Sequence, residues 1–69
     1  METFASRMRE LRKEQKMTQD ELAERLGISR SAVGMYEQGR REPDFEMLDL
    51  VADVFIAGAE DIANKLVFI

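Results

Sequence analysis

The chain has 69 residues, enough for a single small domain, and it contains neither cysteine nor histidine. These absences exclude a disulfide framework, a zinc site with sulfur or nitrogen ligands, and catalysis by a Ser-His or Cys-His pair. The net charge of −4 is unevenly placed, because residues 1–41 sum to +2 and residues 42–69 sum to −6.

The first predicted helix runs from about Thr3 to about Gln15, with apolar residues at helical spacing on one face. These residues are Phe4, Met8 and Leu11. A second helix is predicted over 18–26. Thr18 and Glu21 form a T-x-x-E capping box at its start, and Gly27 is expected to end it because glycine readily takes positive φ.

A third helix is predicted over 29–38, after a turn of only three or four residues. Ser29 is its expected N-cap, and Gly39 is expected to end it. Two capped helices that are joined by a short turn containing glycine are typical of a helix-turn-helix unit.

A loop that contains Pro43 leads to a fourth predicted helix, which Asp44 caps. Its expected inner face comprises Leu48, Val51, Ala52 and Phe55. A fifth helix is predicted to begin near Ala59, just after Gly58. Its expected inner face comprises Ile62, Leu66 and Ile69. We therefore predict an all-α fold, a compact bundle of five short helices in one domain over residues 1–69.

The third predicted helix has two contrasting faces when successive residues are placed about 100° apart. The side predicted to face the core carries Ala32, Val33 and Tyr36. The opposite arc has a cation, a hydroxyl, a glycine and a thioether, and it has no carboxylate although the chain is acidic. The residues of this outer arc are Arg30, Ser31, Gly34 and Met35.

The side chains of this arc suit the major groove of DNA. Arg30 can donate two hydrogen bonds to guanine, Ser31 can bond to a base edge or a phosphate, and Met35 can pack on a thymine methyl group. Gly34 removes bulk and allows close approach. Residues placed for phosphate contacts are Gln19, Arg40 and Arg41. Each residue taken singly also fits an ordinary surface, so the prediction depends on their joint spacing.

The stretch TQDELAERLGISRSAVGMYEQGRREPD combines several motifs: a T-Q opening, E-L-A before L-G-I-S, and Y-E-x-G before a proline. The run resembles the Cro and phage-repressor type of helix-turn-helix domain, and the resemblance extends over roughly residues 4–55. It implies a five-helix domain that docks its third helix in the major groove, usually as a dimer on a two-fold symmetric operator. By position, the family's DNA contacts correspond to Gln19, Ser29, Arg30, Ser31, Met35 and Arg40.

The same family often pairs an arginine with a glutamate at the positions of Arg12 and Glu37. Each lies at the edge of an inner face, where a long side chain can bury its stem and keep its head polar. A bidentate pair between them would fix the angle between the first and third helices. The alternative is two solvated surface charges, together worth less than about 1 kcal/mol.

The C-terminal part departs from the family pattern. After the phenylalanine of the fourth helix, the family usually has Gly or Asn, Val, and a Ser or Thr cap, whereas Ile56-Ala57-Gly58-Ala59 stands here. Either the last two helices are joined differently or the chain end packs on a partner. The apolar residues 66–69 close the monomer core or, as our candidate, form a homodimer contact.

These features predict sequence-specific binding to double-stranded DNA by a transcriptional regulator, in the simplest case a bacterial or phage repressor acting as a homodimer. The alternatives are an antitoxin that represses its own operon and a protein-interaction module that uses the acidic C-terminal half. We expect no enzyme, because no nucleophile has a paired base. We also expect no cofactor, metal or small-molecule ligand. The absence of an apolar span or a signal-peptide pattern predicts a cytoplasmic protein.

Overall fold

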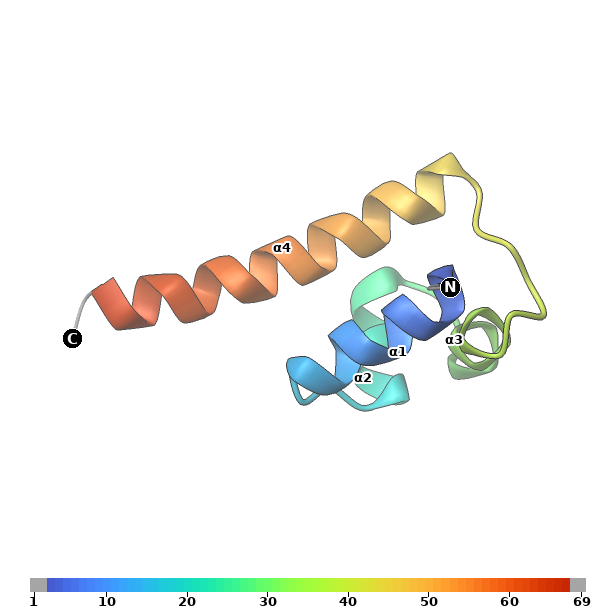
Figure 1. Ribbon diagram of the computed structural model, residues 1–69, viewed down its shortest axis with the longest axis horizontal. Coiled ribbons are helices and arrows are strands. Elements are labelled where there is room, and N and C mark those ends of the chain that lie inside the picture. The colour runs from blue at the N-terminus through green and yellow to red at the C-terminus, as the bar shows by residue number, and fades with distance from the viewer. Residues whose placement is uncertain (1–2, 68–69) are drawn as a thin grey trace.

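The computed structural model describes residues 3–67, and for residues 58–67 it describes the backbone only. Within that part the fold is all-α, and the helices follow one another in chain order. They are α1 (Phe4–Glu14), α2 (Gln19–Leu26), α3 (Arg30–Glu37) and α4 (Phe45–Val67). The first three form a compact body, and α4 runs along one side of this body and continues well past it (Figure 1).

The predicted helix caps of the helix-turn-helix segment are confirmed. The Thr18 hydroxyl accepts a hydrogen bond from the Glu21 backbone N–H at 3.1 Å, and the Glu21 carboxylate accepts one from the Thr18 N–H at 3.4 Å. The Ser29 hydroxyl caps α3, and the Asp44 carboxylate caps α4. Gly27 ends α2 with φ of 71°, a left-handed conformation that glycine adopts without steric cost. Local sequence therefore sets these boundaries to within one or two residues.

The prediction of five helices is wrong, because residues 45–67 form one continuous helix. No break occurs at Gly58, and no separate helix begins near Ala59. Glycine in a helix interior costs only about 1 kcal/mol relative to alanine, and here alanines flank it on both sides. The segment also lacks a proline and a hydroxyl cap that would end one helix and start another. The helix therefore continues through the point where the family usually turns.

The hydrophobic core lies where the three-helix body meets the first half of α4. Met8, Leu22 and Val33 are fully buried at its centre. Val51 and Phe55 close it from the side of α4, being only 6% exposed each. Burying these side chains provides most of the drive for folding in so small a domain.

Two residues that the sequence assigns to the inner face of the fourth helix are exposed instead. Leu48 is 39% exposed, and Ala52 is also exposed. The reason is geometric: α4 turns Val51 and Phe55 to the body, and its apolar stripe is wider than the face that the body covers. The predicted contact at residues 66–69 falls on side chains outside those that the structure describes.

Candidate nucleic-acid interface

α2 and α3 form a helix-turn-helix unit through the turn at 27–29. After Gly27, the backbone N–H of Ile28 donates to the Ala23 carbonyl at 3.0 Å, which completes the C-terminal end of α2. α3 then packs on the body through its inner face, whose members Ala32, Val33 and Tyr36 are buried as predicted. The opposite face of α3 consequently points to solvent.

The solvent-facing side of α3 and the first residue of α2 together form one shallow depression. Its lining residues are Gln19, Arg30, Ser31, Gly34, Met35 and Gln38. A Cβ added at Gly34 would meet no atom within 4 Å, so nothing inside the protein requires a glycine there. The depression thus brings together five of the predicted contact residues, and the space in front of Gly34 is open.

Gln38 belongs to this surface, although sequence reasoning misses it because it stands at the end of the third helix. A signal was available in its helical angle, which is about 80° from Arg30 and falls inside the outer arc. A glutamine amide can make a bidentate pair with adenine in the major groove. Gln38 therefore adds a second side chain with base-reading chemistry to the depression.

Three predicted contact residues do not line the depression. The Ser29 hydroxyl accepts the Ala32 backbone N–H at 3.0 Å as the cap of α3. The Arg40 side chain is exposed beyond the end of α3. The Arg41 guanidinium lies over the ring of Tyr36, 5.2 Å from its centroid, in a cation–π contact. Arg41 is thus held toward the α1 side of the body rather than beside Arg30.

An acidic residue of α2 stands next to the outer face of α3. The Asp20 carboxylate lies 3.7 Å from Nε of Arg30, and both side chains are mostly exposed. α3 itself carries no carboxylate on this face, but its neighbour supplies one. Such an exposed pair contributes little to stability, since solvent and salt screen it. It does place a negative charge at the edge of the depression.

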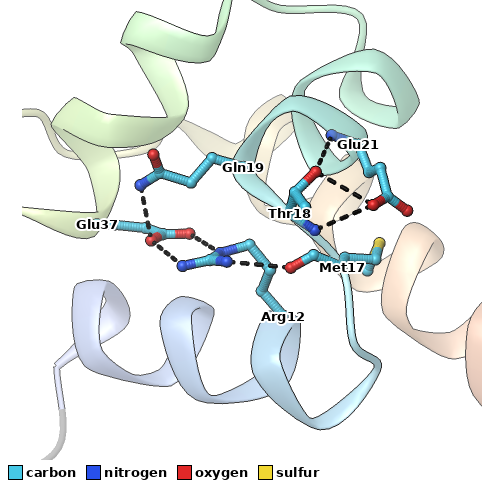
Figure 2. A network of polar contacts seen from close by, with 6 residues as sticks. All are labelled: Arg12, Met17, Thr18, Gln19, Glu21 and Glu37. Carbon is cyan, nitrogen blue, oxygen red and sulfur yellow. Dashed lines mark hydrogen bonds and ion pairs between the residues drawn. The ribbon is translucent and has the colours of Figure 1, made fainter.

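The Arg12–Glu37 pair joins α1 to α3 (Figure 2). Nε of Arg12 donates to one Glu37 oxygen at 2.7 Å, and Nη2 donates to the other at 3.0 Å. Nη1 of Arg12 donates to the Met17 carbonyl at 3.0 Å, which ties the loop before α2 to the same group. The two side chains are 13% and 2% exposed, respectively. A bidentate pair in this setting has one favourable geometry and so fixes how α3 lies against α1.

Gln19 is bound to the same carboxylate. Its Nε2 donates to Oε1 of Glu37 at 3.2 Å, so α1, α2 and α3 all contribute to one network (Figure 2). One amide hydrogen is used in this bond, and the second hydrogen and the carbonyl oxygen are left for a ligand. The position of Gln19 at the rim of the depression is therefore set by the protein before any ligand arrives.

The sequence itself shows which protein family the chain belongs to. Residues 8–58 match the profile of the helix-turn-helix family, from the middle of α1 through the helix-turn-helix unit and into α4. The chain belongs to this family. The resemblance to the Cro and phage-repressor type is thereby confirmed.

Several helix-turn-helix regulators are similar to the chain. The HTH-type transcriptional regulator YqaE of Bacillus subtilis is 39% identical over 51 residues, which are 74% of this chain and 44% of that protein. An HTH-type transcriptional regulator of Archaeoglobus fulgidus is 39% identical over 57 residues, covering 83% of this chain and 80% of the relative. The HTH-type transcriptional activator BcrR of Enterococcus faecalis is 30% identical over 61 residues, or 88% and 30% of the two chains. No solved structure gives a significant match.

The helix-turn-helix family, to which the chain belongs, is also that of the HTH-type transcriptional regulators named above. The chain spans less than half the length of YqaE and of the B. subtilis regulator YobD, at 44% and 46%. Among the described residues, no helix is long and apolar enough to cross a membrane. In the same part of the chain, no three carboxylates gather where they could hold a metal ion.

Proposed function

We propose that α3 enters the major groove of double-stranded DNA and that the depression on its outer face reads a specific sequence. The observation that carries this proposal is the depression itself. It gathers cationic, amide, hydroxyl and thioether side chains on one exposed helix face, while the opposite face is anchored in the core. The major groove is wide enough to admit such a helix.

Each residue of the depression has a role in this proposal. Arg30 donates to guanine O6 and N7, Gln38 pairs with adenine, and Met35 packs on a thymine methyl group. Gly34 lets the helix axis approach the bases, and Ser31 bonds to a base edge or a phosphate. Phosphate contacts come from Gln19, Ser29, Arg40 and Arg41.

The buried network supports base reading because it holds α3 and the start of α2 in a fixed relative position. Glu37 is on α3 and it binds both Arg12 of α1 and Gln19 of α2. The recognition helix and the phosphate-binding end of α2 therefore keep one relative position. A fixed arrangement lowers the cost of ordering side chains at the moment of binding.

The chain's net charge of −4 opposes DNA binding only at long range. Local charge decides the contact, and residues 1–41 carry nine cations against seven acids. Phosphate contacts release condensed counterions, so affinity should fall steeply as salt rises. A salt-independent affinity for DNA would contradict the proposed contacts.

We further propose that the protein binds as a homodimer to a two-fold symmetric operator and acts in the cytoplasm as a repressor. One recognition helix covers too few base pairs for useful specificity in a genome. Two helices related by a two-fold axis, about 34 Å apart, double the site. A repressor needs no further surface to act, because occupying an operator is enough to block transcription.

Selection of binding sites from a pool of random duplexes tests the proposal. We expect enrichment of a palindromic site whose half-sites are one helical turn apart. Enrichment of a single half-site would overturn the dimer and keep the reading by α3. No enrichment above the input pool at low salt would overturn sequence-specific binding. Reporter expression from a promoter that overlaps the selected site then separates a repressor from an activator.

A further inference from the structure

Arg30 stands on the border between two neighbouring hollows. The first is the depression on the outer face of α3, and the second lies at the start of α2. The residues that line the second hollow are Arg12, Met17, Thr18, Gln19, Asp20 and Arg30. Gln19 and Arg30 line both hollows, whereas Asp20 lines only the second. Arg30 therefore has the depression on one side and the Asp20 carboxylate on the other.

Among the described residues that line these two hollows, Asp20 is the only one with a carboxylate. Two other acidic side chains near the start of α2 are already hydrogen-bonded within the protein. The Glu21 carboxylate takes part in the cap of α2, and the Glu37 carboxylate is bound within the buried network (Figure 2). The Asp20 side chain is 77% exposed instead, and its described partner is Arg30. The charge of Asp20 can therefore act on a ligand that approaches either hollow.

The contact between Asp20 and Arg30 uses one edge of the guanidinium group. Oδ1 of Asp20 lies 3.7 Å from Nε of Arg30, which is beyond hydrogen-bond distance, so the two groups form a loose ion pair. The guanidinium is a planar fork with five N–H donors. A carboxylate beside Nε leaves the end of this fork, with Nη1 and Nη2, for the O6 and N7 atoms of a guanine.

The negative charge of Asp20 should affect specific and non-specific DNA complexes differently. A phosphate bound by Gln19 lies close to the next residue, Asp20, and these like charges repel on every duplex. In a non-specific complex, Arg30 also has to leave Asp20 in order to reach a phosphate. When Arg30 donates to guanine it stays beside Asp20, and the exclusion of water from the groove strengthens the pair. Asp20 therefore costs more affinity on random DNA than on the selected operator.

We propose that Asp20 is a positioning residue that raises the sequence specificity of α3. It holds the Nε edge of Arg30, and this favours the pose in which the Nη pair meets guanine over poses in which Arg30 binds a phosphate. Discrimination of this kind comes from weakening the wrong complex as well as from stabilising the right one. The inference rests on the proposed function, since it requires that α3 reads bases.

A purely structural role for Asp20 is the alternative that the test has to separate. An acidic residue in the first turn of a helix interacts favourably with the helix dipole, and Asp20 is the second residue of α2. A residue with that role alone affects the stability of the protein and leaves its preference among DNA sequences unchanged. The ratio of the affinities for the selected operator and for random duplex therefore distinguishes the two roles.

Asp20→Asn tests the inference in fluorescence anisotropy titrations with the selected operator and with random duplex. It removes the charge and keeps the size of the side chain. We expect the affinity for random duplex to rise about fivefold, the upper end of what one exposed charge interaction contributes, and the affinity for the operator to change less than about twofold. Glu24→Gln is the matched control, because it removes the same charge from an exposed position of α2 outside both hollows. It should leave the ratio of the two affinities unchanged.

The same substitution in an Arg30→Ala background shows whether Asp20 acts through Arg30. We expect Asp20→Asn to leave the ratio unchanged there, because no guanidinium remains to be positioned. An equal change of the ratio in both backgrounds, or an unchanged ratio in the original one, would overturn the inference. The proposed function would still stand if Arg30→Ala alone lowers the ratio. If the unaltered protein selects no site, the proposed function and this inference both fail.

Discussion

The three-helix body and α4 are held in different ways. The body combines an apolar core with a buried polar network, in which Arg12, Gln19 and Glu37 link all three helices. α4 rests on it mainly through Val51 and Phe55, and the described polar link between them is a bond from the Gln15 amide to the Phe55 carbonyl at 2.9 Å. The network fixes how α1, α2 and α3 lie against one another, whereas α4 keeps large apolar side chains exposed.

The rigid three-helix body fits the base reading that we propose for α3. A surface that reads bases needs an angle fixed within narrow limits, and directional charge-assisted hydrogen bonds supply it. Breaking the network should therefore damage the body strongly, while changes on the exposed side of α4, away from Val51 and Phe55, should be tolerated.

The largest effect is expected at the ion pair. Arg12→Met and Glu37→Leu should each lower the free energy of unfolding by about 3–5 kcal/mol, because each leaves a buried charge without its partner. The double variant should lose clearly less than the sum of the two. Urea denaturation of all four proteins measures this coupling. Lys13→Met, which removes the neighbouring exposed cation of α1, is the control and should change stability by less than about 1 kcal/mol. Small and additive losses would mean that the pair is not structural.

Smaller changes in stability, of opposite sign, are expected at two glycines, Gly27 of the three-helix body and Gly58 of α4. Gly27→Ala should destabilise the protein by roughly 1–2 kcal/mol, because φ of 71° is unfavourable for a residue with a Cβ. Gly58→Ala should stabilise it by about 0.5–1 kcal/mol, because this glycine lies inside the continuous α4. Thermal unfolding measures both changes. Destabilisation by Gly58→Ala would indicate that α4 bends there in solution.

A change in stability as small as that at Gly58 is expected at the recognition surface. Gly34→Ala should raise the free energy of unfolding by about 0.5–1 kcal/mol, since alanine favours helix and its Cβ meets no atom within 4 Å. Affinity for the selected DNA site should nevertheless fall, because the added methyl group occupies the depression. Unchanged affinity in a fluorescence anisotropy titration would place the DNA bases away from Gly34.

Local signals made the body predictable. The caps at Thr18 and Ser29, the left-handed Gly27 and the inner residues of α3 all follow from short-range rules that the fold does not override. Such features depend on residues three or four positions apart, so a single sequence contains all the information needed. The α3 side of the depression follows from helical angles, and Gln38 has an angle on the same arc although the prediction omitted it.

The features that sequence reasoning missed depend on contacts across the fold. Nothing local predicts that Asp20 of α2 stands beside Arg30, or that the Gln19 amide binds Glu37. The predicted break in α4 is wrong because Gly58 alone does not end a helix, and no neighbouring residue signals an end there. The exposure of Leu48 depends on how far the body reaches around α4, which hydrophobic periodicity does not give.

Arg30 tests most directly whether α3 reads bases through its outer face. On the selected operator, Arg30→Ala should weaken binding by about 1–3 kcal/mol and relax the preference at one base pair, with little change on random duplex. Arg40→Ala should weaken binding to both duplexes alike and lower the salt slope by about one. Arg25→Ala, which removes an exposed cation of α2 outside the depression, is the charge control. Equal losses on operator and random duplex for Arg30→Ala would contradict the account, because Arg30 would then be a phosphate contact only.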